Sequence, residues 1–227
     1  MSTQIQNITL LSGAFLFLFV LAETLYHKYK VKVEYTRKMD HMTTGLIALT
    51  FPFLFKTHWI ILGLSAGFLF LLIGSQKFKW LQSIIAVKRK TIGAQLFPIV
   101  LYFSFLFYDT NNEPLFYYLP ILLLAICDPI AAFVGKKYPY GVFKIKGHQK
   151  TLMGSLGFSI AATVISVSSI LLSDQYLLVD NILLVIAIAL IVTLSEALVI
   201  NGFDNITIPV STWTVLLLFH QPIIQYV

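Results

Sequence analysis

The sequence predicts an all-α protein: a polytopic bundle of transmembrane helices with about eight spans, forming one domain over residues 1–227. Three observations carry this prediction. Of the 227 residues, 58% are hydrophobic and only 11% are charged, and the mean hydropathy is +0.83. Such a composition lies outside the range of soluble globular domains. Apolar runs near the roughly 20 residues that a helix needs to cross a bilayer recur along the whole chain.

The first apolar run is expected to remain in the protein as a span. No Lys or Arg precedes it, and it is longer than the core of a cleavable signal. Polar or charged connections separate the later runs, and the shortest connection lies at 56–58. The eight expected spans cover 8–27, 41–57, 58–75, 92–108, 115–134, 152–172, 181–200 and 206–224.

Lys and Arg are concentrated in alternate connections. The connections 28–40, 76–91 and 135–151 each hold five of them, and the intervening connections hold only Lys56. The positive-inside rule places these three connections in the cytoplasm and both termini on the other side of the membrane. The net charge of +6 is therefore read as a signal of orientation, and nucleic acid is not expected as a partner. The connection 76–91 also interleaves apolar and basic residues, which suits either an interfacial amphipathic helix or a plain positive anchor.

Charged side chains inside or at the ends of spans are costly, so each needs a partner or a function. Asp128 ends the fifth expected span, Glu196 lies near the end of the seventh, and Asp204 follows it. Arg37 and His41 flank the start of the second. All five fall at the expected cytoplasmic face. Because Mg²⁺ prefers hard oxygen ligands, Asp128, Asp204 and Glu196 are the candidate metal ligands.

The stretch 127–155 combines features that suit a bound phosphate. It holds five lysines, and its glycines Gly135, Gly141 and Gly147 allow close approach of backbone N–H groups to an anion. The sixth expected span begins there, and the first turn of a helix offers unpaired N–H groups. The spacing does not match a P-loop. The candidate phosphate-binding residues are Arg37, Lys38, Gly135, Lys136, Lys137, Lys150, Thr151, Gly154 and Ser155.

Several of these residues also have an ordinary structural explanation. Lys144 and Lys146 suit plain positive-inside charges, and His41 suits a polar residue at a helix start. Glu196 could pair with Arg37 or with a backbone donor inside the bundle. The one cysteine, Cys127, excludes an intrachain disulfide framework and a cysteine-based zinc site.

Four short motifs occur in order along the chain: R-K-x-x-H at 37–41, D-P-x-A-x-x-x-G at 128–135, K-T-x-x-G-S at 150–155 and F-D-N-x-x-x-P at 203–209. Together they resemble the family of dolichol kinases, phytol kinases and CTP-dependent diacylglycerol kinases. The resemblance implies a membrane enzyme that uses CTP and Mg²⁺ to phosphorylate a lipid alcohol. It places Asp128, Gly135, Lys150, Gly154 and Ser155 in the nucleotide-binding stretch, and Arg37, His41, Asp204 and Asn205 at other signature positions. Met153 stands where the family commonly has Glu.

The expected function is a CTP-dependent kinase for a long-chain isoprenoid alcohol, acting at the cytoplasmic face of the lipid bilayer. The expected catalytic residues are Asp128, Asp204, His41 and Lys150, and Asp204 and His41 are both candidates for the base. Three alternatives stay open: a diacylglycerol kinase, a phosphatidate cytidylyltransferase similar to CDP-diacylglycerol synthase, and a transporter of anionic lipids. The stretch 202–205 lacks the arginine of the cytidylyltransferase signature, which favours the kinase. The sequence sets no oligomeric state.

Overall fold

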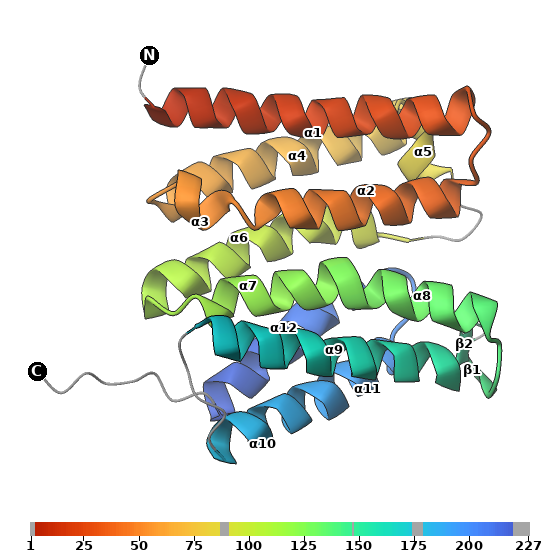
Figure 1. Cartoon of the computed structure of the whole chain (residues 1–227). Coiled ribbons are helices and arrows are strands. Elements are labelled where there is room, and N and C mark those ends of the chain that lie inside the picture. The colour runs from red at the N-terminus through yellow and green to blue at the C-terminus, as the bar shows by residue number, and fades with distance from the viewer. Residues whose placement is uncertain (1–2, 87–90, 147, 174–178, 220–227) are drawn as a thin grey trace, which may run out of the picture.

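The computed structural model describes residues 3–86, 91–146, 148–173 and 179–219. It is 81% helical, and its long helices lie side by side along a common direction (Figure 1). The first half contains α1 (Thr3–His27), α2 (Val33–Ala48), the short α3 (Phe51–Leu54), α4 (His58–Phe78), the short α5 (Gln82–Ile85) and α6 (Gly93–Asn111).

The second half begins with one continuous helix built from α7 (Leu115–Leu122), the π-helical turn η1 (Leu123–Cys127) and α8 (Asp128–Lys137). The strands β1 (Val142–Ile145) and β2 (His148–Thr151) follow, and then α9 (Leu152–Leu172). A second helix with a π turn consists of α10 (Val179–Ala187), η2 (Ile188–Val192) and α11 (Thr193–Leu198), and α12 (Asp204–Phe219) completes the described chain.

Within the described parts of the chain, five helices are long and apolar enough to cross a membrane, which agrees with a helical membrane bundle. They are Thr3–His27, His58–Phe78, Leu115–Lys137, Leu152–Leu172 and Asn181–Leu198. The other three expected spans correspond to α2, α6 and α12, and both α2 and α12 are 16 residues long. The count of eight spans is therefore not confirmed and stays a prediction. Residues 220–224 of the last expected span lie outside the described residues.

The helix Leu115–Lys137 forms the centre of the bundle. More than half of its apolar window is buried, and Tyr117 inside it donates a hydrogen bond from its hydroxyl to Ala48 O at 2.6 Å. Trp213 of α12 donates from Nε1 to Phe116 O at 3.1 Å. Pro129 has no N–H to give to the helical ladder, and the π turn η1 lies just before it. Such widened turns are frequent at functional sites, and this one ends directly before Asp128.

The second expected span, 41–57, has the wrong boundaries. The helix α2 begins at Val33 and ends at Ala48, and α3 resumes at Phe51 with Pro52 in its first turn. The hydropathy pattern missed the first turns of α2 because they carry charged residues that face the inside of the protein. Arg37 and His41 consequently lie within a helix and do not flank its start.

The connection after Lys137 contains a short β-hairpin, which was not predicted within the otherwise helical bundle. Strands β1 and β2 pair antiparallel, with Val142 opposite Thr151 and Ile145 opposite His148. Gly141 precedes the hairpin with a φ of +65°, and a Cβ atom there would lie 2.6 Å from Leu152 Cδ1. Glycine therefore suits both its backbone and its packing. Gly147, one of the glycines expected near a phosphate, lies outside the described residues.

The described part of the connection 76–91 packs against the bundle, and its role as an interfacial helix or a positive anchor stays a prediction. This part contains α5, which is held to the bundle by two hydrogen bonds: Ser83 N to Glu23 Oε1 at 2.7 Å, and Thr36 Oγ1 to Ser83 O at 2.8 Å. Ile84 of α5 packs with Phe19 and Leu72. The short helix thus closes one side of the bundle. Lys88, Arg89 and Lys90 lie outside the described residues.

The start of α1 and the end of α12 lie at the same end of the bundle, at the left in Figure 1. The opposite end carries α5, the hairpin and the start of α12. The described residues of the three basic connections lie at that opposite end. The two ends of the bundle are therefore different in charge, and the side of the membrane that each faces stays a prediction.

Candidate active site

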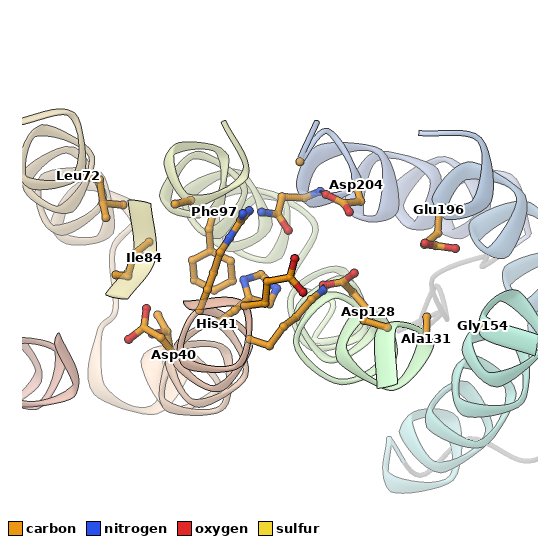
Figure 2. A pocket seen from close by; sticks show the side chains of 18 of the residues that line it. Asp40, His41, Leu72, Ile84, Phe97, Asp128, Ala131, Gly154, Glu196 and Asp204 are labelled. Carbon is orange, nitrogen blue, oxygen red and sulfur yellow. Dashed lines mark hydrogen bonds and ion pairs between the residues drawn. The ribbon is translucent and has the colours of Figure 1, made fainter. Parts of the chain in front are cut away.

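A cavity of about 420 Å³ lies among helices from both halves of the chain. Part of its lining is charged or polar and part is apolar (Figure 2). The apolar part includes Phe15, Phe19, Leu64, Phe68, Leu72 and Leu101. The charged part includes Arg37, Lys38, His41, Asp128, Lys150, Glu196 and Asp204.

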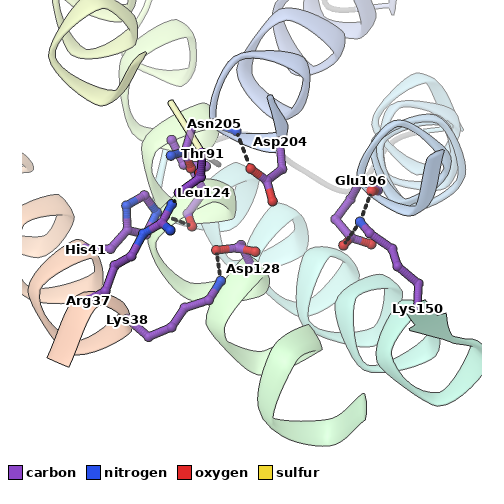
Figure 3. Close-up of polar contacts among 10 residues, drawn as sticks. All are labelled: Arg37, Lys38, His41, Thr91, Leu124, Asp128, Lys150, Glu196, Asp204 and Asn205. Atoms are coloured by element: carbon purple, nitrogen blue, oxygen red, sulfur yellow. Dashed lines mark hydrogen bonds and ion pairs between the residues drawn. The ribbon is translucent and has the colours of Figure 1, made fainter. Parts of the chain in front are cut away.

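Asp128 is the first residue of α8 and is 7% exposed. Lys38, from α2, forms an ion pair with Asp128 Oδ2. Asp204 is the first residue of α12, and Figure 3 shows its carboxyl group and that of Asp128 facing a common space. The two negative charges act on each other unfavourably. Residues 76 positions apart in sequence are thus brought together, because the starts of α8 and α12 lie near each other inside the bundle.

Three cations surround this pair of carboxylates. Lys38 and Lys150 lie within electrostatic range of both Asp128 and Asp204, and Arg37 lies within range of Asp204. Arg37 reaches across from α2 and donates from Nη2 to Thr91 Oγ1 at 3.0 Å. The centre therefore combines two carboxylates, from α8 and α12, with three cations, from α2 and β2.

His41 lies one helical turn after Arg37 and Lys38 on α2. Its Nε2 is 3.2 Å from the carbonyl oxygen of Leu124, and its ring meets that of Phe97 edge-on at a centroid distance of 5.1 Å. Because a carbonyl oxygen can only accept, Nε2 is the protonated nitrogen in this contact. The neutral ring then offers Nδ1 as its acceptor.

Asp204 and Asn205 are positioned by a tight loop. Asp204 Oδ1 accepts a hydrogen bond from the N–H of Asn205 at 3.0 Å. The preceding Gly202 has a φ of +85°, and Gly93 packs so closely that a Cβ atom there would lie 2.5 Å from Asn205 Nδ2. The same atom would lie 2.9 Å from Arg37 Nη2. Gly93 therefore leaves room for the side chains of Arg37 and Asn205, a role that no sequence pattern indicated.

Lys150 and Glu196 form a second buried ion pair. Lys150 Nζ donates to Glu196 Oε1 at 2.5 Å and also to the backbone carbonyl of Glu196. Glu196 thus pairs with Lys150, not with Arg37, inside the bundle. Among the described residues, no three His, Cys, Asp or Glu side chains form a group that could hold a metal ion. The expected set of three carboxylate ligands is therefore not assembled, and Asp128 and Asp204 are the two that face each other.

Two glycines expected to bind phosphate serve a packing role. A Cβ atom on Gly154 would lie 2.9 Å from Ala131 O, and one on Gly135 would lie 2.6 Å from Thr151 Oγ1. These residues let α8 and α9 approach closely. Thr151 caps α9 by accepting from the N–H of Gly154 at 3.0 Å, so that N–H is already satisfied. Thr151 and Ser155 nevertheless line the cavity, as do both glycines.

The remaining lysines differ in their placement. Lys136 lines the cavity and pairs with Glu34, and both side chains are more than half exposed. Lys137 lies over the ring of Tyr138, at 5.4 Å from its centroid. Among the described lining residues, Lys137 does not occur. Asp40 and Gln149 do line the cavity and were not predicted. Asp40 follows Arg37 by three residues, and this helical spacing is the signal that could have found it.

The comparisons with known proteins give no match: none with a protein-family model, none with a curated protein and none with a solved structure. What the chain does must therefore be judged from its own residues and from the shape of this cavity.

Proposed function

We propose that this protein is a membrane-embedded kinase that transfers the terminal phosphoryl group of a nucleoside triphosphate to the hydroxyl group of a lipid alcohol. The observation that carries the proposal is the two-part cavity. Facing carboxylates and cations line one part of it, and aromatic and aliphatic side chains line the other. A water-soluble, highly charged donor and a membrane-soluble acceptor could meet in such a space.

The residues present fit a magnesium ion that arrives with the nucleotide. Mg²⁺ in proteins commonly binds one or two carboxylates and completes its shell with water and phosphate oxygens. Asp128 and Asp204 would supply those carboxylates, and a cation between them would relieve their mutual repulsion. The bound ion would neutralise charge on the transferring phosphoryl group. Through this ion, Asp128 and Asp204 would hold the nucleoside triphosphate in place.

The cations of the site would bind the phosphates. Lys38 now pairs with Asp128, so a metal on Asp128 would free its ammonium group for a phosphate oxygen. Arg37 can present a planar fork of donors to a second phosphate. Lys150 is fixed by Glu196 and lies in range of both aspartates. Phosphoryl transfer needs mainly alignment and charge neutralisation, which these groups would provide.

The acceptor would lie with its chain along the apolar part of the cavity and its hydroxyl toward the aspartates. The hydroxyl proton needs an acceptor nearby, and Asp204 and His41 Nδ1 are the two candidates. The donor is proposed to be CTP and the site to face the cytoplasm, on the resemblance of the motifs and the distribution of Lys and Arg. An isoprenoid alcohol is the acceptor that the same resemblance implies.

The test is transfer by the purified protein in detergent, with CTP, UTP and ATP offered against a panel of lipid alcohols. We expect Asp128→Asn to lower turnover by roughly 100-fold or more, because it removes a carboxylate that would hold the magnesium ion on the phosphates. The matched control is Asp109→Asn at the far end of the bundle, where Asp109 pairs with His58. It should leave turnover unchanged.

The products separate the related reactions. A kinase releases a nucleoside diphosphate, whereas a cytidylyltransferase releases pyrophosphate. Release of pyrophosphate from CTP would refute the kinase proposal and support a cytidylyltransferase reaction at the same site. Turnover that survives Asp128→Asn would remove this carboxylate from the mechanism.

A further inference from the structure

A second polar group lies in the cavity away from the facing carboxylates. Asp40 lines the cavity from α2 and is 9% exposed. Its Oδ1 has no hydrogen-bond partner within the described parts of the chain. Figure 2 shows Asp40 on the side of α2 toward Ile84, whereas Asp128 and Asp204 lie on the other side. The transfer chemistry proposed above makes no use of Asp40.

The surroundings of Asp40 are apolar. Its carboxyl group forms no ion pair among the described residues. Ile84, Leu72 and Phe19 pack together and line the same cavity. A buried polar group without a partner is unfavourable and uncommon in native proteins. Such a group in the wall of a cavity therefore indicates a missing ligand.

Two hydroxyl side chains in the cavity wall are likewise buried without a hydrogen-bond partner. Thr44 lies one helical turn after Asp40 on α2, and Ser65 lies on α4. Both line the cavity, and in each the hydroxyl oxygen is buried with no hydrogen-bond partner in the described structure. The described lining of the cavity thus carries three oxygen atoms without a hydrogen-bond partner, on two helices.

We propose that Asp40, with Thr44 and Ser65, forms a second polar subsite that binds an uncharged hydrogen-bonding group of the lipid substrate. Thr44 and Ser65 carry no charge, and the apolar walls disfavour an ion. A hydroxyl group fits best because it can both donate and accept. The inference rests on the proposed kinase function but replaces the simple isoprenoid alcohol as acceptor: the acceptor is a lipid alcohol with a second hydroxyl group.

The test compares two lipids that share one chain. Monoolein carries two free hydroxyl groups, and oleyl alcohol carries one. Binding of each to the full-length protein in detergent is measured without nucleotide, from the rise in unfolding temperature with lipid concentration. We expect wild type to bind monoolein roughly tenfold more tightly, as one or two added hydrogen bonds would give. We expect Asp40→Leu to remove the preference.

Thr44→Val provides a second, gentler variant because it replaces one hydroxyl by a methyl group of similar shape. It should reduce the preference for monoolein. The control is Thr43→Val on the same helix. Thr43 donates to Met39 O of its own helix at 2.8 Å and does not occur among the described residues that line the cavity. It should keep the full preference.

Equal binding of the two lipids by wild type would overturn the subsite, as would a preference that survives both Asp40→Leu and Thr44→Val. The measurement contains no nucleotide, so a preference that depends on Asp40 would support the subsite even if no phosphoryl transfer were found. Conversely, equally efficient phosphorylation of both alcohols by wild type would leave the kinase intact and refute the subsite.

Discussion

Lys38 and Lys136 form the two lysine–carboxylate pairs of α2 with α8, and they differ in burial. Lys38 and Asp128 are 23% and 10% exposed as side chains, whereas Lys136 and Glu34 are 52% and 55% exposed. Removing one partner of a buried pair leaves the other charge without compensation. An exposed pair contributes little to the free energy of unfolding, because water and salt screen its charges.

We therefore expect Lys38→Met to lower the free energy of unfolding by about 3 kcal/mol. Lys136→Met, the same change in an exposed pair, should cost under about 1 kcal/mol. Unfolding by denaturing detergent, followed by tryptophan fluorescence, measures both. Equal losses in the two variants would show that the Lys38–Asp128 pair is as screened as the surface pair.

At the scale of single residues, the sequence predicted which residues line the cavity better than it predicted which residues contact each other. Asp128, Asp204 and Arg37 could be picked out because charged residues next to apolar runs need a reason. The partner of Glu196 and the use of the Gly154 N–H by Thr151 could not be predicted. Both depend on how α9 meets its neighbours in space. Asp40 escaped notice because its importance comes from a cavity wall that only the folded chain creates.

At the scale of elements, the close contact of α8 and α9 positions Asp128 beside the start of α9. Gly154 faces Ala131 across this contact, and a Cβ atom would lie 2.9 Å from the Ala131 carbonyl oxygen. Backbone atoms on both sides leave little room to relax. Any added atom should therefore push the two helices apart.

We expect Gly154→Ala to lower the free energy of unfolding by about 1–3 kcal/mol, the usual cost of overpacking. The control is Gly13→Ala on α1, where a Cβ atom would meet nothing within 4 Å. It should cause no loss, since alanine is the better helix former. The same unfolding assay applies, and a Gly154→Ala protein as stable as Gly13→Ala would contradict tight packing at this contact.

Element boundaries were predictable where hydropathy changes sharply and not elsewhere. The start of α9 at Leu152 was expected, because a basic connection ends there and an apolar run begins. The start of α2 at Val33 was not, because its first turns carry the charged residues that line the cavity. The hairpin was not predicted, because each of its strands has only four residues and the lysines and glycines of the connection 135–151 indicated a loop.

At the scale of the whole molecule, the charged part of the cavity lies toward the end of the bundle that carries the described residues of the basic connections. The sequence could predict this shared end from charge alone. It could not predict that apolar residues of α1 and α4 line the same cavity as Asp128. That arrangement depends on the packing order of the helices, which local patterns do not specify. The side of the membrane that this end of the bundle faces decides whether cytoplasmic nucleoside triphosphate could reach the proposed site.

Cysteine labelling tests the orientation. Tyr140, 76% exposed, lies next to the hairpin at the site end, and Thr57 is exposed at the opposite end, between α3 and α4. In a Cys127→Ala background, we expect Tyr140→Cys to react with a membrane-impermeant maleimide only after the cells are opened. Thr57→Cys should react in intact cells. Labelling of Tyr140→Cys in intact cells would place the proposed nucleotide site outside, where cytoplasmic triphosphates cannot reach it, and the kinase proposal would fail.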